Sequence, residues 1–285
     1  MEETKIYQSM IGGLQWGIQI GRFDITTSVM TLSRFCAAPR KGHLERVKRI
    51  YGYLVKMRHG VIRIRTELPD YSDIPEKVFD WFYSCYHGAK ELIPDGLPEP
   101  KGKPVITTSW VDANLCHDLV SGRSVTGILH KLNETPVDWF SKLQSTVETA
   151  TYGSEFVAAR TCTEQIIDLR MTLRYLGVPI KGSGMMFGDN ETVVNSASLP
   201  HSKLHKRHNA LSYHKVREAI AAGIIQFHHI YGDTNPADIL SKHWDMPSVW
   251  NTLRGLMFWR WEKDGGGKVD DDAEPSTDAH SSTNS

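Results

Sequence analysis

The stretch MMFGDNETVV, residues 185–194, leads from an apolar strand directly into Asp189 and continues with the spacing of a helix. An ionised carboxylate at the edge of an apolar core is costly unless a cation or hydrogen-bond donors meet it. The stretch therefore predicts that Asp189 has charged or polar partners at this strand end.

Three further carboxylates lie at the margins of apolar segments. Asp112 lies within TTSWVDANL, Glu155 opens the apolar part of a helical stretch in TYGSEFVAAR, and Asp238 lies in NPADILSK. If the strand of Asp112 is central and neighbours the strand that ends at Asp189, both aspartates emerge at one end of the sheet, where open α/β sheets bind ligands. Glu155 on a covering helix can reach the same point.

Clustered carboxylates repel one another and are stable together only with divalent cations between them. Oxygen ligands without Cys or a required His favour Mg²⁺ or Mn²⁺ over zinc. A carboxylate cluster that holds two such ions about 3.5–4 Å apart is typical of enzymes that hydrolyse phosphodiesters. We therefore expect a nuclease with two bound ions.

The apolar pattern predicts an α/β fold beyond Pro104. The segments VITTSWVDANL, SVTGILHKL and PVDWFSKL are rich in β-branched and aromatic residues and are expected to form an antiparallel meander. A long helix then ends at Gly177 and Pro179, before the strand GMMFGD, a helix from Asn190 and the strand IIQFHHIYG. This order predicts a mixed sheet covered by helices.

Before this region, helical periodicity recurs twice, with Pro39 between the two helices. Residues 66–103 are rich in Pro, Gly, Asp and Glu and are expected to be a linker or insertion. The predicted organisation is a helical segment over 1–65, the linker, an α/β domain over 104–262 and a disordered tail over 263–285.

Composition limits the classes of partner. Lys and Arg number 33 against 33 Asp and Glu, so the overall charge gives no argument for nucleic-acid binding. Scattered cysteines, the lack of a secretory leader and the lack of an apolar run of roughly 20 residues lead us to expect a soluble, intracellular protein that does not enter a membrane. Basic residues do concentrate on the two N-terminal helices: Arg34, Arg40, Lys41, Arg46, Lys48, Arg49, Lys56 and Arg58.

The motifs SWVDANLCHD, GRSVTGILHKLNETPVDWFSKLQSTVETATYGSEFVAA, MMFGDNETVV, YHKVREAIAAG and NPADILSK follow one another in an order that resembles the ribonuclease H domain of copia-type LTR retrotransposon polyproteins. The resemblance covers roughly residues 104–243, and residues 7–54 look like the segment that joins the reverse-transcriptase polymerase to that domain. It implies a ribonuclease H-like mixed five-stranded sheet flanked by helices and preceded by a small helical segment. The implied activity is cleavage of the RNA strand of an RNA–DNA hybrid during reverse transcription.

The resemblance also implies roles for individual residues. Asp112, Glu155, Asp189 and Asp238 match the family's catalytic carboxylates, which bind the two Mg²⁺ or Mn²⁺ ions. The implied partners are the hybrid and the polymerase portion of the same polyprotein, inside a cytoplasmic virus-like particle or the nucleus. The residues expected to contact nucleic acid are Thr151, Tyr152, Ser154, Asn190, Lys203, Lys206, Arg207 and His208.

The sequence departs from the family pattern in three places. Asn114 stands where copia elements commonly show a second aspartate, and residues 66–103 are longer than the usual connector. YGDTNPAD lacks the histidine that cellular relatives carry before the last aspartate, so we expect product release to depend on another group or on water.

Several alternatives stay open. Asp189 and Asp238 can instead be helix caps. His201, His205 and His208 have a helical spacing that also suits zinc, and their basic segment can be plain solvated surface. The chain has no Y-x-D-D polymerase motif, and an integrase is disfavoured because the glutamate precedes the second aspartate. The other candidate function is an inactive retroelement remnant that only binds nucleic acid or protein.

Overall fold

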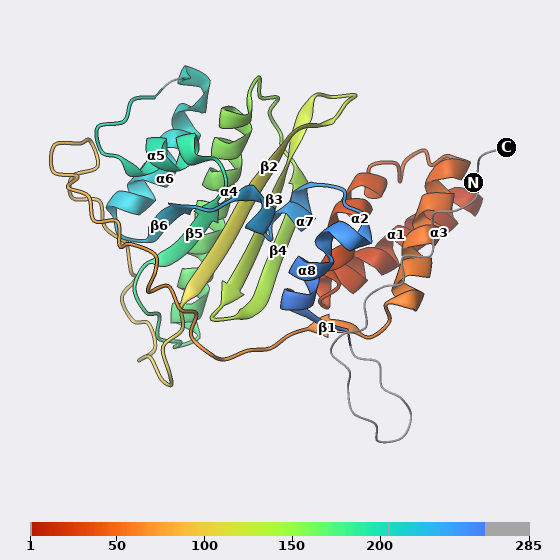
Figure 1. Ribbon diagram of the computed structural model, residues 1–285, viewed down its shortest axis with the longest axis horizontal. Helices are drawn as coiled ribbons and strands as arrows, with labels where there is room; N and C mark the ends of the chain where they lie inside the picture. Colours follow the sequence, from red (N-terminus) through yellow and green to blue (C-terminus); the bar gives the residue numbers. More distant parts are fainter. Residues whose placement is uncertain (1, 205, 260–285) are drawn as a thin grey trace.

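The computed structural model describes residues 2–204 and 206–259. Their centre is a five-stranded sheet in the order β4-β3-β2-β5-β6 (Figure 1). Pairing is antiparallel between β2 and β3 and between β3 and β4, and β5 runs parallel to both β2 and β6, so the expected mixed sheet is confirmed. The strands are β2 (Thr107–Asp118), β3 (Arg123–Leu132), β4 (Thr135–Leu143), β5 (Gly184–Gly188) and β6 (Ile225–His229).

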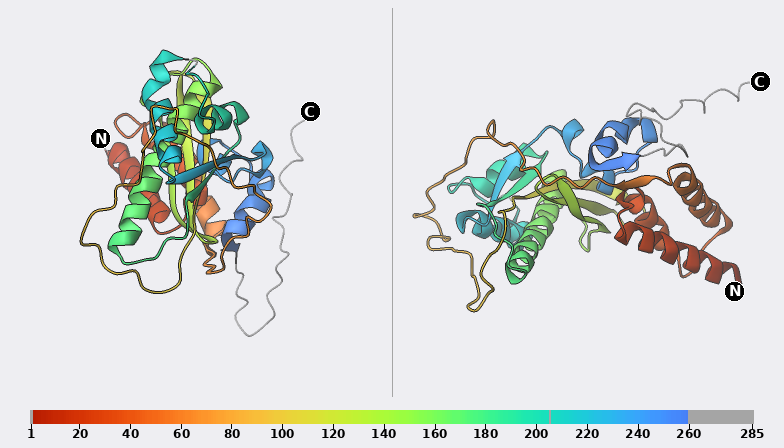
Figure 2. Two further views of the ribbon diagram at one scale, coloured as in Figure 1. Left: turned by 90° about the vertical axis from the view of Figure 1, so that its left-hand side faces the viewer. Right: turned by 90° about the horizontal axis from the view of Figure 1, so that it is seen from below.

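Three helices pack on one face of this sheet, and Figure 2 shows α4 and α6 together on that side. Phe156 and Ile166 of α4 are fully buried against Val111 of β2 and Met186 of β5. Burial of each such side chain contributes about 1.5–3 kcal/mol. The helices are α4 (Thr151–Tyr175), α5 (Glu191–Ser198) and α6 (Ala210–Ala221).

The opposite face of the sheet is covered by segments from both ends of the chain. Ile128 of β3 faces α4, whereas the next residue, Leu129, packs with Phe23, Leu240 and Leu253. A short antiparallel ladder between β1 and β7 also joins the two ends. These elements are η1 (Phe23–Ile25), β1 (Gly60–Ile62), α7 (Asp238–Ser241), α8 (Met246–Leu256) and β7 (Met257–Trp259).

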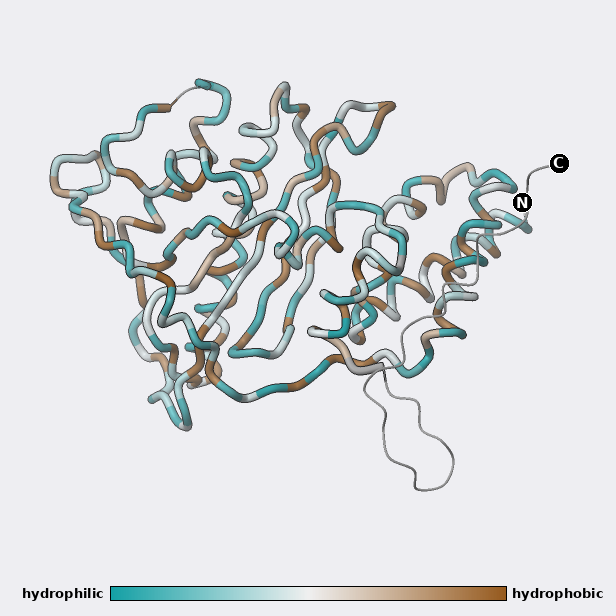
Figure 3. Tube along the Cα trace, in the orientation of Figure 1, coloured by the Kyte–Doolittle hydropathy of each residue, from teal (hydrophilic) through white to brown (hydrophobic). Residues whose placement is uncertain are grey.

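The N-terminal helices have a core of their own, formed around Tyr7, Leu14, Val29 and Val47. Hydropathy alternates along these helices in Figure 3, because each has one buried face. The two helices expected on either side of Pro39 are present, whereas the first helix was not expected from the sequence pattern. The three are α1 (Glu2–Gln19), α2 (Thr26–Ser33) and α3 (Lys41–Lys56).

Specific hydrogen bonds join the N-terminal helices to the sheet and to α7. The Thr27 hydroxyl donates to the carbonyl of Ile239 at 2.7 Å, and the Trp139 indole N–H of β4 donates to the carbonyl of Ile18 at 3.1 Å. Arg34 also pairs with Asp118, at the end of β2, at 2.6 Å. The N-terminal helices are therefore packed against α7, β4 and the end of β2.

Residues 66–103, called the strap below, contain no helix or strand and run around the edge of the sheet (Figure 1). Tyr71 shares a hydrogen bond of 2.8 Å with Thr108, and Lys77 donates to the carbonyl of Phe227 at 3.0 Å. The strap is therefore packed along the sheet and its helices.

Two further expectations from the sequence were the lack of a membrane-spanning helix and the positions of the domain boundaries. Within the described residues, no helix is long and apolar enough to cross a membrane. The tail predicted for 263–285 lies outside the described residues. The division of the chain at residues 65, 103 and 262 stays a prediction.

Glu91 is the ionic anchor of the strap on α4, since its carboxylate accepts hydrogen bonds from Arg174 at 2.6 and 2.7 Å and from Arg170 at 3.1 and 3.2 Å. Burial opposes its charge, but the two guanidinium groups outweigh burial and lower the pKa of Glu91 to about 2. We expect Glu91→Ala to lower the free energy of unfolding by about 2 kcal/mol at neutral pH.

Urea unfolding at several pH values checks this prediction, with the exposed Glu99→Ala as control. Because the folded-state pKa is depressed, the stabilisation is present above about pH 5 and is lost as the pH falls toward 2. The difference between parent and Glu91→Ala should shrink over that range. A difference that is absent at neutral pH or independent of pH would contradict this role of Glu91.

Candidate active site

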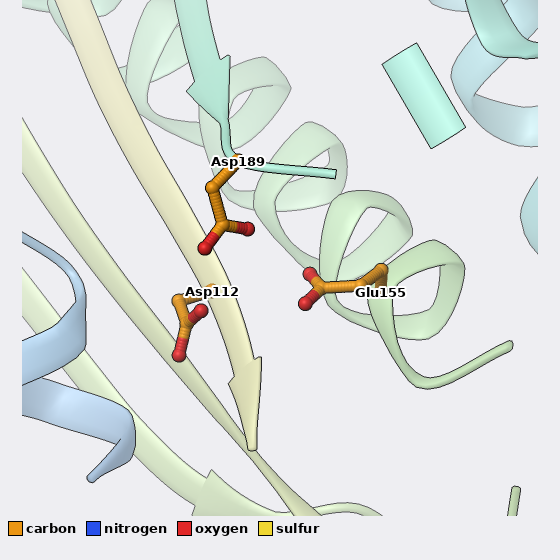
Figure 4. Close-up of side chains that lie close together, drawn as sticks. All are labelled: Asp112, Glu155 and Asp189. Carbon is orange, nitrogen blue, oxygen red and sulfur yellow. The ribbon is translucent and has the colours of Figure 1, made fainter. Parts of the chain in front are cut away.

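Three carboxylates converge next to the carboxyl end of β5 (Figure 4). Asp112 lies on β2, Asp189 follows β5 and Glu155 lies in the first turns of α4. One carboxylate oxygen from each lies within 4.8 Å of the other two. The convergence predicted from the sequence is present for these three residues.

The pairing of β2 with β5 explains this placement. Val111 lies opposite Gly188 in the parallel register, so the next residue of each segment is an aspartate. A Cβ atom at Gly188 would lie 3.1 Å from the Phe227 ring and 3.5 Å from Val111, so glycine permits this close approach. Phe156, which is fully buried, fixes the turn of α4 that carries Glu155.

The carboxylates occupy an unfavourable electrostatic environment. Burial, followed by the charges of Asp112 and Asp189, raises the pKa of Glu155 well above its usual value. Burial and Asp112 also raise the pKa of Asp189. Repulsion of this kind is relieved by a divalent cation, and an all-oxygen donor set fits Mg²⁺ or Mn²⁺. The residues present therefore fit the ions that the sequence led us to expect.

Asp238 reaches the cluster through a lysine. The ammonium group of Lys242 lies 2.6 Å from Asp238 Oδ1 and 3.3 Å from Asp112 Oδ1. Burial and then Asp112 raise the pKa of Asp238 to about 7, although Lys242 opposes this shift. Asp238 thus lies beside the group of three carboxylates, and the Lys242 ammonium group connects it to Asp112.

Close packing of α7 on β3 brings Asp238 and Lys242 close to Asp112. Asp112 lies opposite Gly127 in the antiparallel pair, and a Cβ atom at Gly127 would lie 2.7 Å from the carbonyl oxygen of Ala237. The same approach lets the Ser241 hydroxyl donate to Asp112 Oδ2. Ser241 and Lys242 were not among the residues expected at the site, although the spacing of four residues from Asp238 places Lys242 one helical turn away.

The structure contradicts the helix-cap alternative. Asn190 is the N-cap of α5, and its side-chain oxygen accepts a hydrogen bond from the Val193 N–H at 3.1 Å. The N-cap of α7 is Ala237, and the Asp238 carboxylate pairs with Lys242. Neither Asp189 nor Asp238 is used as a cap, whereas Asn190, expected to contact nucleic acid, is.

The start of α4 only partly matches the predicted nucleic-acid contacts. Thr151 is exposed, and the Tyr152 hydroxyl shares a hydrogen bond of 2.9 Å with Ser196. Ser154 is fully buried, and its hydroxyl donates to the carbonyl of Thr151 at 2.9 Å. Burial of Ser154 gives this residue no exposed surface, and its predicted contact with nucleic acid stays a prediction.

The basic segment before α6 lies close to the loop that precedes α4. Lys203 and Arg207 are exposed, and Lys206 donates to the Thr149 hydroxyl at 3.4 Å. His208 Nε2 lies 3.1 Å from the buried carboxylate of Glu148, a residue not expected at the site from the sequence.

No second metal-ligand group supports the zinc alternative in the part of the chain that the structure describes. The carboxylate cluster is the one group of metal-ligating side chains found there. His205 lies outside the described residues. His208 pairs with Glu148, as a surface histidine next to a carboxylate does without any metal.

Asn114 and His229 are polar residues close to the carboxylates. Asn114 donates to the carbonyl of Ser241 at 3.3 Å and shares a hydrogen bond with His117. His229, which ends β6, has its Nε2 atom 3.1 Å from the backbone oxygen of Asp189. A histidine therefore lies at the rim, although YGDTNPAD contains none.

No family model matches the chain. The chain is 25% identical over 236 residues to the retrovirus-related Pol polyprotein from transposon TNT 1-94 of Nicotiana tabacum, and the match covers 83% of this chain and 15% of that protein. It is 23% identical over 239 residues to the corresponding protein from transposon RE1 of Arabidopsis thaliana, covering 83% and 14%. The resemblance to copia-type Pol polyproteins is thus confirmed, and the chain spans about 15% of the length of these relatives.

Among solved structures, the chain is similar to LC11-RNase H1 in complex with an RNA/DNA hybrid. That match has 17% sequence identity and a TM-score of 0.38, and it covers 47% of this chain and 93% of the other.

Metal-free protein should lose stability as the pH rises through the titration of the cluster. A carboxyl group whose pKa is raised by folding binds more protons in the folded state, so its repulsion is absent near pH 4 and develops toward pH 7, the value near which Asp238 titrates. We expect Glu155→Gln to raise the metal-free melting temperature at pH 7 by about 2–4 °C and to flatten its pH dependence.

Thermal melting in chelator between pH 4 and 8 measures this effect. The control is Asp168→Asn, an exposed carboxylate on α4. A lower melting temperature for Glu155→Gln with an unchanged pH dependence would show that Glu155 stabilises the metal-free fold.

Proposed function

We propose that this chain, whose sequence is similar to retrotransposon Pol polyproteins, is a ribonuclease H that hydrolyses the RNA strand of an RNA–DNA hybrid with two divalent ions. The main support for the proposal is the convergence of Asp112, Glu155 and Asp189 next to the carboxyl end of β5, where β2 runs parallel to it. Three repelling carboxylates in a mostly buried position are costly for the fold and are useful only with cations.

In this proposal Asp112, Glu155, Asp189 and Asp238 hold Mg²⁺ or Mn²⁺. Such ions supply an activated water and stabilise the leaving oxygen. The chain's own residues position the ligands: the Ser241 hydroxyl orients Asp112, and Lys242 keeps Asp238 close to it. Lys242 also brings a positive charge to a place where a phosphate approaches.

Binding of the hybrid would depend on local basic surfaces because the net charge is zero. Lys203, Arg207, Arg46 and Arg49 are exposed and form two such surfaces, on the segment before α6 and on α3. The polymerase portion of the same polyprotein is expected to add further contacts. The competing proposal, an inactive remnant that only binds, predicts binding without cleavage.

The Asp189→Asn variant distinguishes a metal-binding role of Asp189 from a purely structural role. The change keeps the size of the side chain but removes its charge, so we expect cleavage of a labelled hybrid in Mg²⁺ to fall at least about 100-fold. The metal-free melting temperature should hold or rise as repulsion is relieved.

The matched control is Asp233→Asn, an exposed aspartate in the short 3-10 helix η3 (Gly232–Thr234) after β6, which should cut like the parent. Cleavage by Asp189→Asn at the parent rate would end the two-metal proposal. Binding of the hybrid without cleavage by the parent would support the inactive remnant.

Substitution of Lys203, Lys206 and Arg207 by Ala should weaken binding of hybrids of any sequence. Loss of up to three phosphate contacts is expected to flatten the dependence of log Kd on log salt concentration by up to about 2–3. Fluorescence anisotropy at several salt concentrations measures the slope. Alanine at Lys90, Lys101 and Lys103 of the strap removes the same charge elsewhere, and an equal change in both triple variants would contradict a specific role.

A further inference from the structure

A cavity of about 270 Å³ lies where α2 and α3 meet α7 and α8. Its size is close to the lower end of small-molecule sites, so it suits one nucleotide-sized group and excludes a duplex. Arg49, Lys242, His243 and Trp244 contribute to the wall. The apolar part of the lining is formed by Ile25, Ile50, Ile239, Val249 and Leu253.

Among the charged side chains that line the cavity, one positively charged group has no ion-pair partner within the described residues. Asp24 is neutralised by Arg22 at 2.7 Å and accepts a hydrogen bond from Tyr53, and Lys242 is engaged by the two carboxylates described above. Burial, followed by His117 and Arg46, lowers the pKa of His243, which is therefore neutral at pH 7. Arg49 is exposed and has no ion-pair partner among the described residues. The cavity therefore favours a ligand with one negative charge.

Trp244 provides a fixed aromatic surface. Its indole N–H donates to the carbonyl of Asp238 at 3.1 Å, and the residue is 47% exposed. The hydrogen bond restricts rotation of the ring, and the adjoining lining is apolar. A partly exposed aromatic ring and an arginine in one lining are a usual means of binding an unpaired base together with its phosphate.

The cavity adjoins the proposed catalytic site. Lys242 lines the cavity and contacts Asp112 and Asp238, and the carbonyl of Asp238 anchors Trp244. A strand that places one phosphate at the carboxylates can therefore place a neighbouring nucleotide in the cavity.

We propose that this cavity binds one unpaired nucleotide of the substrate, with its base on Trp244 and its phosphate on Arg49. The inference rests on the proposed function only in assuming that a nucleic-acid strand lies at the carboxylates. A base stacked on Trp244 is not paired in the hybrid. The protein consequently prefers hybrids that continue into single-stranded RNA, at the end whose extension reaches the cavity.

The test compares a blunt hybrid with hybrids that carry about four extra RNA nucleotides at the 5′ or the 3′ end. Binding is measured by fluorescence anisotropy in chelator, so that a failure of catalysis does not affect it. We expect the parent to bind one extended hybrid about tenfold more tightly than the blunt one. Trp244→Ala and Arg49→Ala should lose this preference, and Trp244→Phe should keep most of it.

The controls are Trp16→Ala, an exposed tryptophan on α1, and Lys48→Ala, an exposed cation on α3. Both should keep the preference of the parent. Equal binding of blunt and extended hybrids by the parent, or a preference that survives in Trp244→Ala and Arg49→Ala, would overturn the proposal. Arg49 is exposed, so its substitution tests the site even if Trp244→Ala is less stable.

Discussion

The candidate site depends on the parallel pairing of β2 with β5. In its register Val111 lies opposite Gly188, so Asp112 within β2 and Asp189 directly after β5 lie side by side. A slip of one residue would move one aspartate to the other face of the sheet. Glycine at position 188 leaves room for Phe227 and Val111, which a Cβ atom there would meet at 3.1 Å and 3.5 Å. The buried core between the sheet and α4 then adds Glu155 to the same point.

The charge balance of the site follows from this geometry. Three carboxylates are held together by packing, although burial and mutual repulsion raise the pKa values of Glu155 and Asp189. Lys242 offsets part of that repulsion by contacting Asp112 and Asp238. Stability of the metal-free fold and affinity for cations are therefore opposed, which is the usual relation between a strained functional site and its scaffold.

The sequence predicted the elements whose signals are local. The apolar runs of β2 and β5, the long helix α4 and the break at Pro39 are all present as expected. The β1–β7 ladder and the path of the strap were not predictable, because they depend on pairing between distant residues with no local pattern. The burial of Ser154 was likewise not predictable from local patterns, because it depends on the packing of α4. The link from Asp238 through Lys242 to Asp112 required the approach of α7 to Gly127.

The most direct test of the account is cleavage of an end-labelled RNA–DNA hybrid by the parent chain across a titration of Mg²⁺ and Mn²⁺. A two-metal ribonuclease H cuts the RNA strand only when a divalent ion is present, so we expect chelator to abolish cutting and the DNA strand to stay intact. A folded chain that binds the hybrid but leaves the RNA uncut at every metal concentration would contradict the account, as would cutting that persists in chelator.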